Sequence, residues 1–136
     1  MNILVTEDEP AIRLTMAAAL RSCGYDVSAA ETGVEALASV EARRPDLIVL
    51  DLNLPVMDGW EFLRILRLRP AYAQIPVLIV TAEHGVTASK LGAQGCLAKP
   101  FDLEDLLEAA EELLRGRGAN AHMEASVSQA ASRHRP

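Results

Sequence analysis

Carboxylates, a hydroxyl group and an ammonium group stand at the ends of separate apolar runs in this sequence. Glu7 and Asp8 follow the first such run, and Asp51 ends another. Thr81 and Lys99 end or follow two later runs. If these runs are parallel strands of one sheet, their carboxyl ends lie along the edge where α/β sheets bind ligands. We therefore expect these side chains to form one site.

The cluster of acidic groups favours a divalent cation. Two carboxylates about 5 Å apart repel each other by roughly 3 kcal/mol at an effective dielectric constant near 20. Oxygen ligands without histidine or thiolate indicate Mg²⁺, which keeps several waters and takes one or two carboxylates. Calcium needs more protein ligands than this set offers. We therefore expect Mg²⁺ at the cluster.

A carboxylate beside Mg²⁺, opposite an ammonium and a hydroxyl group, suits the acceptance of a phosphoryl group as an acyl phosphate. The charge on the transferring oxygens must be met by metal and by cationic groups, and Mg²⁺, Lys99 and Thr81 fit those roles. Asp51 needs no general base, because an aspartate is ionised at neutral pH. Asp51 is therefore the predicted nucleophile.

Strand and helix patterns alternate along the chain. Short apolar runs, most of them continuous, predict strands, over residues 2–6, 25–30, 47–51, 76–81 and 95–98. Apolar residues at helical spacing predict helices, which begin near Pro10, Thr32, Asp58 and Leu103. The segment 83–94 contains two glycines and little periodicity, so we expect a shortened fourth helix there.

Local residue signals mark where these helices begin and end. Residues 32–35 and 58–61 both have capping-box form, with a capping side chain followed three residues later by glutamate. Pro10 suits a first helical turn, Asp102 suits a cap, and Gly24 suits the residue after a helix.

This alternation predicts one α/β domain. Five strand–helix units indicate a doubly wound, five-stranded parallel sheet of the flavodoxin-like type, with right-handed crossovers and strand order 2-1-3-4-5. We expect the domain to span residues 1–115. Residues 116–136 are rich in Ala, Ser, Gly and Arg, so we expect a disordered polar tail.

The composition argues against several classes of partner. The net charge is −6, whereas nucleic-acid binding requires a basic face. No apolar run approaches the length of a membrane span, and the N-terminus lacks the pattern of a signal peptide. Cys23 and Cys96 have no metal-binding spacing, and we interpret both as small buried residues in a reducing compartment. We expect a cytoplasmic protein with no nucleic-acid or membrane partner.

Four motifs, each following or ending a predicted strand, resemble those of response-regulator receiver domains, the aspartate-phosphorylated component of two-component signalling. They are residues 3–9, 51–59, 80–82 and 99–101. Each motif alone is weak evidence for this family. All four in this order, over residues 2 to about 115, are specific for it. We expect a stand-alone receiver, because residues 116–136 are too few and too polar for a DNA-binding helix-turn-helix.

The resemblance implies a role for each site residue. Asp51 is the phosphoacceptor, Asp8 and Asp51 are Mg²⁺ ligands, Asn53 binds Mg²⁺ through its backbone carbonyl, and Glu7 acts through a metal-bound water. Lys99 contacts the phosphoryl group, and its bond to the following proline is cis.

The resemblance also implies partners. The phosphoryl donor is a histidine kinase or a histidine phosphotransfer protein, and the output is an unidentified target protein or a phosphorelay. The domain promotes its own phosphotransfer, in which Thr81 and Lys99 take part, and its own dephosphorylation, without being an enzyme that acts on a separate substrate.

The sequence departs from the family at the output face. Cys96 stands where the family has Tyr or Phe, and Thr81 and Lys99 are 18 positions apart, about four fewer than expected. Both changes put the ring-rotation switch of the family in question. Asn53 and Glu83 stand where the family flanks the path of the water that attacks the phosphoryl group, so we expect Glu83 to modulate dephosphorylation.

Two alternatives differ in class. An aspartyl-phosphate phosphatase of the haloacid-dehalogenase type needs a second aspartate two residues after the first and places its motif on the first strand, whereas this chain has Asn53 and a motif on the third strand. A phosphorylation-independent, receiver-like binding module is the other alternative. The intact set of Asp8, Asp51, Thr81 and Lys99 argues against it.

Overall fold

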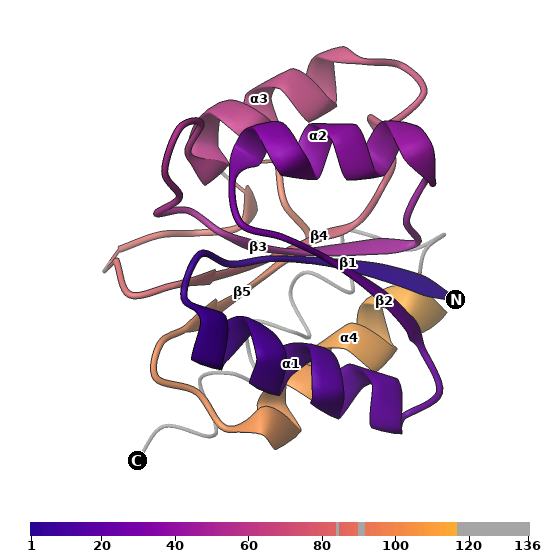
Figure 1. Cartoon of the computed structure of the whole chain (residues 1–136), viewed down its shortest axis with the longest axis vertical. Helices are drawn as coiled ribbons and strands as arrows, with labels where there is room; N and C mark the ends of the chain where they lie inside the picture. Colours follow the sequence, from indigo (N-terminus) through magenta and orange to yellow (C-terminus); the bar gives the residue numbers. More distant parts are fainter. Residues whose placement is uncertain (84, 90–91, 117–136) are drawn as a thin grey trace.

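The computed structural model describes residues 1–83, 85–89 and 92–116 of the chain. Its centre is a single five-stranded sheet in which neighbouring strands are parallel and the order is β2-β1-β3-β4-β5 (Figure 1). The strands are β1 (Asn2–Thr6), β2 (Asp26–Ala30), β3 (Leu47–Asp51), β4 (Val77–Thr81) and β5 (Gly95–Ala98). The predicted sheet and strand order are confirmed.

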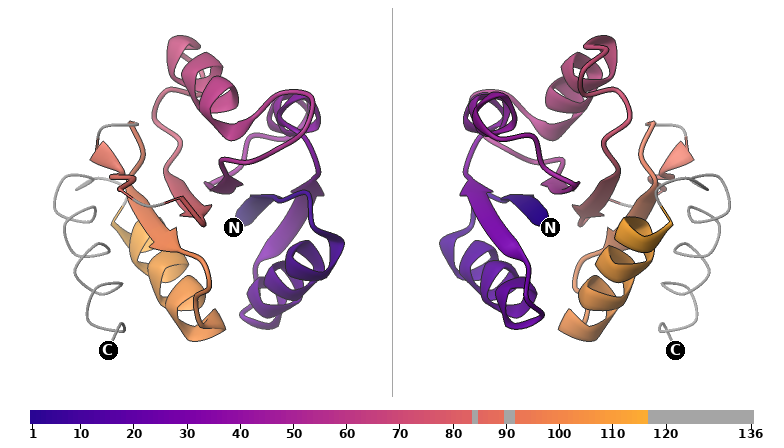
Figure 2. Two further views of the ribbon diagram at one scale, coloured as in Figure 1. Left: turned by 90° about the vertical axis from the view of Figure 1, so that its left-hand side faces the viewer. Right: turned by 90° about the vertical axis from the view of Figure 1, so that its right-hand side faces the viewer.

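Helices cover both faces of this sheet. They are α1 (Pro10–Ser22), α2 (Gly33–Ala42), α3 (Gly59–Leu68) and α4 (Leu103–Arg115). Helices α2 and α3 lie together on one face, and α1 and α4 lie side by side on the other (Figures 1 and 2). The four helices predicted outside residues 83–94 are present. The shortened helix predicted within 83–94 is not found, because the described residues of that segment form no α-helix.

The two faces of the sheet bury two separate apolar clusters, because successive side chains of a strand point to opposite faces. In β1, Ile3 and Val5 pack with α1 and α4. Leu4, between them, packs instead with α2 and α3. Every residue of β1, β3 and β4 is buried, which explains why these strands read as continuous apolar runs.

Most of the predicted helix signals are confirmed. Thr32 Oγ1 accepts a hydrogen bond from Glu35 N at 3.0 Å, and Asp58 Oδ1 accepts one from Glu61 N at 2.9 Å. Pro10 is in the first turn of α1, and Gly24 follows this helix with φ of 93°.

One of two predictions about single residues is wrong. Asp102 is the N-cap residue of α4, as predicted, although its side chain makes no capping hydrogen bond. Cys23, which the sequence predicts to be buried, is exposed, because it is the C-cap residue of α1 and lies beyond Leu20, the last buried residue of that helix. Cys96 in β5 is half-buried.

The described part of the chain ends at Gly116, so the remainder of the predicted polar tail, residues 117–136, lies outside the described residues. Among the described helices, none combines the length and the apolar character that crossing a membrane requires.

Candidate functional site

The sheet register brings the predicted site residues to one edge. Asp51 is the last residue of β3 and pairs with Val80 of β4, next to Thr81. Thr81 in turn pairs with the last residue of β5, and Lys99 follows, its backbone N–H donating to Thr81 O at 2.8 Å. Glu7 directly follows β1, and its N–H donates to Ala30 O at 3.0 Å. The carboxyl ends of four neighbouring strands therefore build one site.

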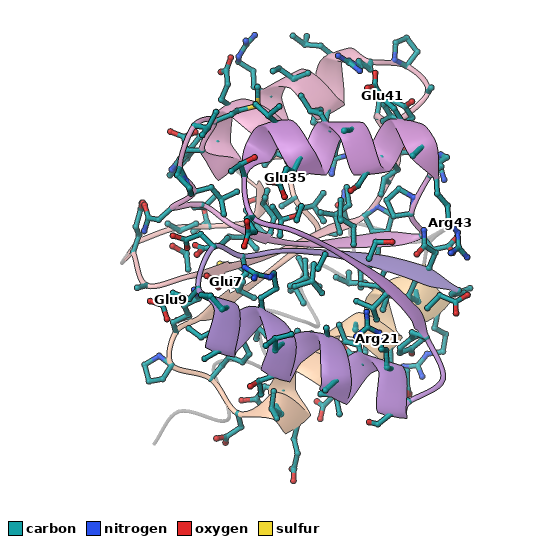
Figure 3. All side chains as sticks on the ribbon, in the orientation of Figure 1. Glu7, Glu9, Arg21, Glu35, Glu41 and Arg43 are labelled. Atoms are coloured by element: carbon teal, nitrogen blue, oxygen red, sulfur yellow. The ribbon has the colours of Figure 1, made fainter. Side chains whose placement is uncertain are left out.

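Three carboxylates meet at this edge. Ligand oxygens of Glu7, Asp8 and Asp51 all lie within 4.8 Å of one another. Glu7 and Asp51 are buried, whereas Asp8 is exposed. Figure 3 places Glu7 and Glu9 at this end of the sheet, above the start of α1. The donors are hard oxygens, two of them shielded from solvent, so the cluster suits Mg²⁺.

Lys99 is shared between two of these carboxylates. Its Nζ lies 2.5 Å from Glu7 Oε1 and 3.1 Å from Asp51 Oδ2. Burial lowers the pKa of Lys99, but its hydrogen bonds to Glu7 and Asp51 raise that pKa by more, so the amine stays charged. Burial raises the pKa of Glu7, and the bond to Lys99 offsets this only in part.

The Asp51 carboxylate is oriented by the loop that follows it. Asn53 N donates to Asp51 Oδ1 at 3.1 Å, and Gly59 N donates to Leu52 O at 2.9 Å. A side chain at Gly59 is excluded, because a Cβ there would lie 2.3 Å from Asp51 O. Val56, 86% exposed, takes a left-handed φ of 68°, which is uncommon for a β-branched residue. The loop therefore folds back tightly beneath Asp51.

Thr81 and the residues around it complete the site. Thr81 is buried, and its Oγ1 accepts a hydrogen bond from Glu83 N at 3.1 Å. Because Oγ1 is the acceptor in this bond, the Thr81 hydroxyl proton can be donated to another group. Glu83 is half-buried and Asn53 is exposed. The Lys99–Pro100 bond is cis, as the resemblance implied.

Sequence reasoning missed Arg13. Its side chain is only 15% exposed, and its Nη1 donates to Glu7 O at 3.0 Å. The signal that could have found it is an arginine one turn into the helix that directly follows the acidic run.

A groove of about 500 Å³ lies beside the site. Its walls come from α1 and from the connection between β5 and α4, and they include the apolar side chains of Ile12, Met16, Phe101 and Leu103. The groove borders Lys99, so a molecule seated in it would lie next to the acidic cluster.

Comparison with known proteins identifies the family. The family described as the response regulator receiver domain matches residues 3–111. The chain therefore belongs to the response regulator receiver domain family, and it is a receiver domain of two-component signalling.

The curated relatives are response regulators. Response regulator MprA of Mycobacterium avium (strain 104) and that of Mycobacterium leprae (strain TN) are each 40% identical over 119 residues. The match covers 85% of this chain and 51% of each relative. The chain thus spans about half the length of the curated relatives it matches.

Solved structures share the fold. The chemotaxis response regulator CheY4 of Vibrio cholerae is 35% identical, with a TM-score of 0.77, and the match covers 82% of this chain and 97% of that one. The signal receiver domain of a signal transduction histidine kinase from Syntrophus aciditrophicus is 31% identical, with a TM-score of 0.79, over 85% of this chain and 90% of that one.

Proposed function

We propose that this chain is a phosphoacceptor response regulator. Asp51 takes a phosphoryl group from a histidine kinase or a histidine phosphotransfer protein, and the aspartyl phosphate changes the binding of a target protein or passes the group along a relay. One observation supports this above the others: the buried Asp51 carboxylate touches the Lys99 ammonium within the cluster of Glu7 and Asp8.

The transfer step follows from this arrangement. An oxygen of the Asp51 carboxylate attacks phosphorus, an O–P bond forms, and the P–N bond to the donor's imidazole breaks with its electron pair returning to the ring nitrogen. Lys99 lies 3.1 Å from Asp51 Oδ2 and is placed to meet the charge on one phosphoryl oxygen. The Thr81 hydroxyl is placed to donate to another.

The same carboxylates fit a magnesium ion. Asp8 and Asp51 would bind it directly, Asn53 through its carbonyl oxygen and Glu7 through a metal-bound water. When bound, Mg²⁺ neutralises charge on the transferring group. The ligand oxygens of the three acidic residues already lie within 4.8 Å of one another, so little rearrangement is needed to hold the ion.

The groove beside Lys99 supports a protein as the donor. A phosphohistidine on a partner must reach Asp51 from the open edge of the sheet, and the groove that borders Lys99 lies next to that approach. Its largely apolar walls suit side chains of a partner protein more than a free, charged phosphodonor.

Acetyl phosphate with Mg²⁺, followed by intact mass spectrometry, tests the proposal. The wild-type chain should gain one phosphoryl group, and the nearly isosteric Asp51→Asn variant should gain none while keeping its circular dichroism spectrum. A wild-type chain that stays unmodified, yet folds and binds Mg²⁺, would instead favour the phosphorylation-independent binding module. Stable phosphorylation of the Asp51→Asn variant would show that the acceptor is another residue.

A further inference from the structure

The side chain of one arginine contacts the backbone of two residues in the acidic loop, residues 7–9. Arg13 Nη1 donates to Glu7 O at 3.0 Å and to Asp8 O at 3.3 Å. The backbone N–H of Arg13 donates to Glu9 O at 2.9 Å. The Arg13 side chain therefore holds two successive carbonyls, those of Glu7 and Asp8. The bond to Glu9 O is the first backbone hydrogen bond of α1 and does not depend on the side chain.

The same guanidinium is fixed from its other side. Arg13 Nη2 forms a 3.0 Å ion pair with Glu31 Oε1, and Glu31 follows β2 directly. Glu31 is itself held, because its N–H donates to Glu35 Oε1 at 3.1 Å at the start of α2. Figure 3 labels Glu35 at the start of α2. The Arg13 side chain thus connects the acidic loop to Glu31, the residue that follows β2.

The backbone of this loop determines where its carboxylates lie. Glu9 N donates to Glu7 Oε2 at 3.2 Å, so the loop backbone orients the Glu7 carboxylate directly. Asp8 is exposed, and the position of its carboxylate depends on the peptide units on either side of it. A displaced loop would therefore separate the oxygens that now lie within 4.8 Å of one another.

We propose that Arg13 is a positioning residue for the metal site: it holds the loop carbonyls so that Glu7 and Asp8 present their carboxylates to Mg²⁺ together with Asp51. This inference rests on the proposed function, because it concerns the same cation. The side chain of Arg13 is bonded to the carbonyls of Glu7 and Asp8 and to Glu31, so in this proposal it touches neither the ion nor the phosphoryl group. It acts through the backbone.

Charge and positioning predict opposite effects of removing Arg13. A nearby positive charge disfavours cation binding, so on electrostatic grounds alone its removal would tighten Mg²⁺ binding. Groups that orient metal ligands typically change metal affinity by roughly 10–100-fold when they are replaced. Positioning therefore predicts weaker binding in spite of the more negative cluster, and the direction of the change distinguishes the two effects.

The test is Mg²⁺ titration by isothermal calorimetry at neutral pH, without any phosphodonor. The Kd for Mg²⁺ should rise about tenfold in Arg13→Gln. It should also rise in Arg13→Lys, which keeps the charge but lacks the planar fork that spans the loop and Glu31. With acetyl phosphate, half-maximal phosphorylation of Arg13→Lys should need more Mg²⁺, while the plateau at saturating Mg²⁺ stays at the wild-type level.

Arg21→Gln is the matched control. Arg21 lies on the same helix and also donates to a backbone carbonyl, Val27 O, at 3.0 Å. Figure 3 places it at the far end of α1 from Glu7 and Glu9. Its removal costs the same charge and a similar hydrogen bond, but Mg²⁺ binding should not weaken.

The outcomes separate this inference from the proposed function. If the wild-type chain binds Mg²⁺ and both Arg13 variants bind it equally well or more tightly, the positioning role is wrong and the metal site stands. If the wild-type chain binds no Mg²⁺, both proposals fail. If Arg13→Gln does not fold, as judged by circular dichroism, Arg13→Lys decides.

Discussion

Lys99 Nζ lies closer to Glu7 Oε1, at 2.5 Å, than to Asp51 Oδ2, at 3.1 Å. The Glu7 side chain is fully buried, and that of Asp51 is 5% exposed. Lys99 is thus bound to both Asp51, the proposed phosphoacceptor, and its acidic neighbour Glu7. Glu7 is fully buried and has only a share of the Lys99 charge, so burying its ionised carboxylate should have a measurable cost in the free energy of unfolding.

The first prediction concerns the pH dependence of stability without Mg²⁺. Because the pKa of Glu7 is raised above 4.5 in the folded chain, the unfolded chain loses this proton first as pH increases. The folded state then binds more protons, so the Glu7 contribution to the free energy of unfolding falls as pH rises from 4.5 through the raised pKa. Glu7→Gln should lack this fall.

The measurement is urea unfolding of both chains across that pH interval. The difference in unfolding free energy between Glu7→Gln and wild type should increase toward neutral pH, by about 1.4 kcal/mol for each unit by which the pKa is raised. A difference that stays flat across the interval would show that Lys99 compensates the burial of Glu7 completely.

The second prediction is stabilisation by Mg²⁺. Binding relieves repulsion within the cluster of Glu7, Asp8 and Asp51, and a ligand at ten times its Kd stabilises the folded state by about 1.4 kcal/mol. Millimolar Mg²⁺ should raise the melting temperature of the wild-type chain. Asp8→Ala should show a smaller rise, and an equal rise would exclude Asp8 as a ligand.

The third prediction concerns the lifetime of the aspartyl phosphate. Glu83 is half-buried beside Thr81, to whose Oγ1 its N–H donates at 3.1 Å, and Asn53 is exposed across the site. Polar side chains at both positions leave a path for water, so we expect comparatively fast dephosphorylation. Glu83→Tyr should slow it several-fold by covering that path.

Decay of the phosphorylated mass after removal of acetyl phosphate gives this rate. Glu83→Gln, which keeps the size of the side chain, should decay much as wild type does. If the tyrosine variant loses phosphate at the wild-type rate, Glu83 has no part in water access.

The fourth prediction concerns a buried hydroxyl. Thr6 is fully buried at the end of β1, and its Oγ1 has no hydrogen-bond partner among the described residues. An unpaired buried polar group costs about 1–3 kcal/mol. Thr6→Val replaces the hydroxyl with a methyl group of similar size, so it should stabilise the fold by about 1 kcal/mol in urea unfolding.

Thr15→Val is the control for that gain. Thr15 is exposed on α1, and its Oγ1 donates to Ala11 O at 2.8 Å, so the same substitution removes a satisfied hydroxyl and should not stabilise the chain. A Thr6→Val chain that is less stable than wild type would show that the Thr6 hydroxyl has a partner.

The fifth prediction concerns output. Phosphorylation should draw Thr81 toward the phosphoryl oxygens and reorder the segment after it, because Cys96 lacks the aromatic ring that the family resemblance led us to expect at this position. Arg67 fixes the far end of that segment, since its Nε donates to Gly92 O at 2.8 Å and its Nη2 to Gln94 Oε1 at 3.1 Å. The response should therefore concentrate in residues 85–89.

Hydrogen exchange with and without beryllofluoride, a phosphoryl mimic, measures this response. Protection should rise in residues 85–89 and change little in 92–94, and Cys96→Ala should respond as wild type does. Strong protection of 85–89 in the free protein, unchanged by the mimic, would exclude a reordering of this segment.

The sequence by itself determined the order of elements and the edge at which the chemistry lies. Continuous apolar runs predict buried parallel strands, and the residues that end them, such as Asp51 and Thr81, must then share one edge because parallel strands all point the same way. Sequence also predicted the start of α2 at Thr32 and of α3 at Asp58, because capping is a local interaction between residues three apart.

Only the tertiary structure decided which side chains touch across that edge. Lys99 lies closer to Glu7 than to Asp51, although Glu7 is 92 positions away from it in the chain and Asp51 only 48. This difference depends on how the folded chain places the three side chains. The place of Arg13 one turn into the helix after the acidic run does not reveal its contacts, because two of its partners are backbone carbonyls, which every residue possesses, and because Glu31 reaches it only after β2 has paired with β1. Contacts of this kind have no periodicity or motif, so they become visible only when distant segments are brought together.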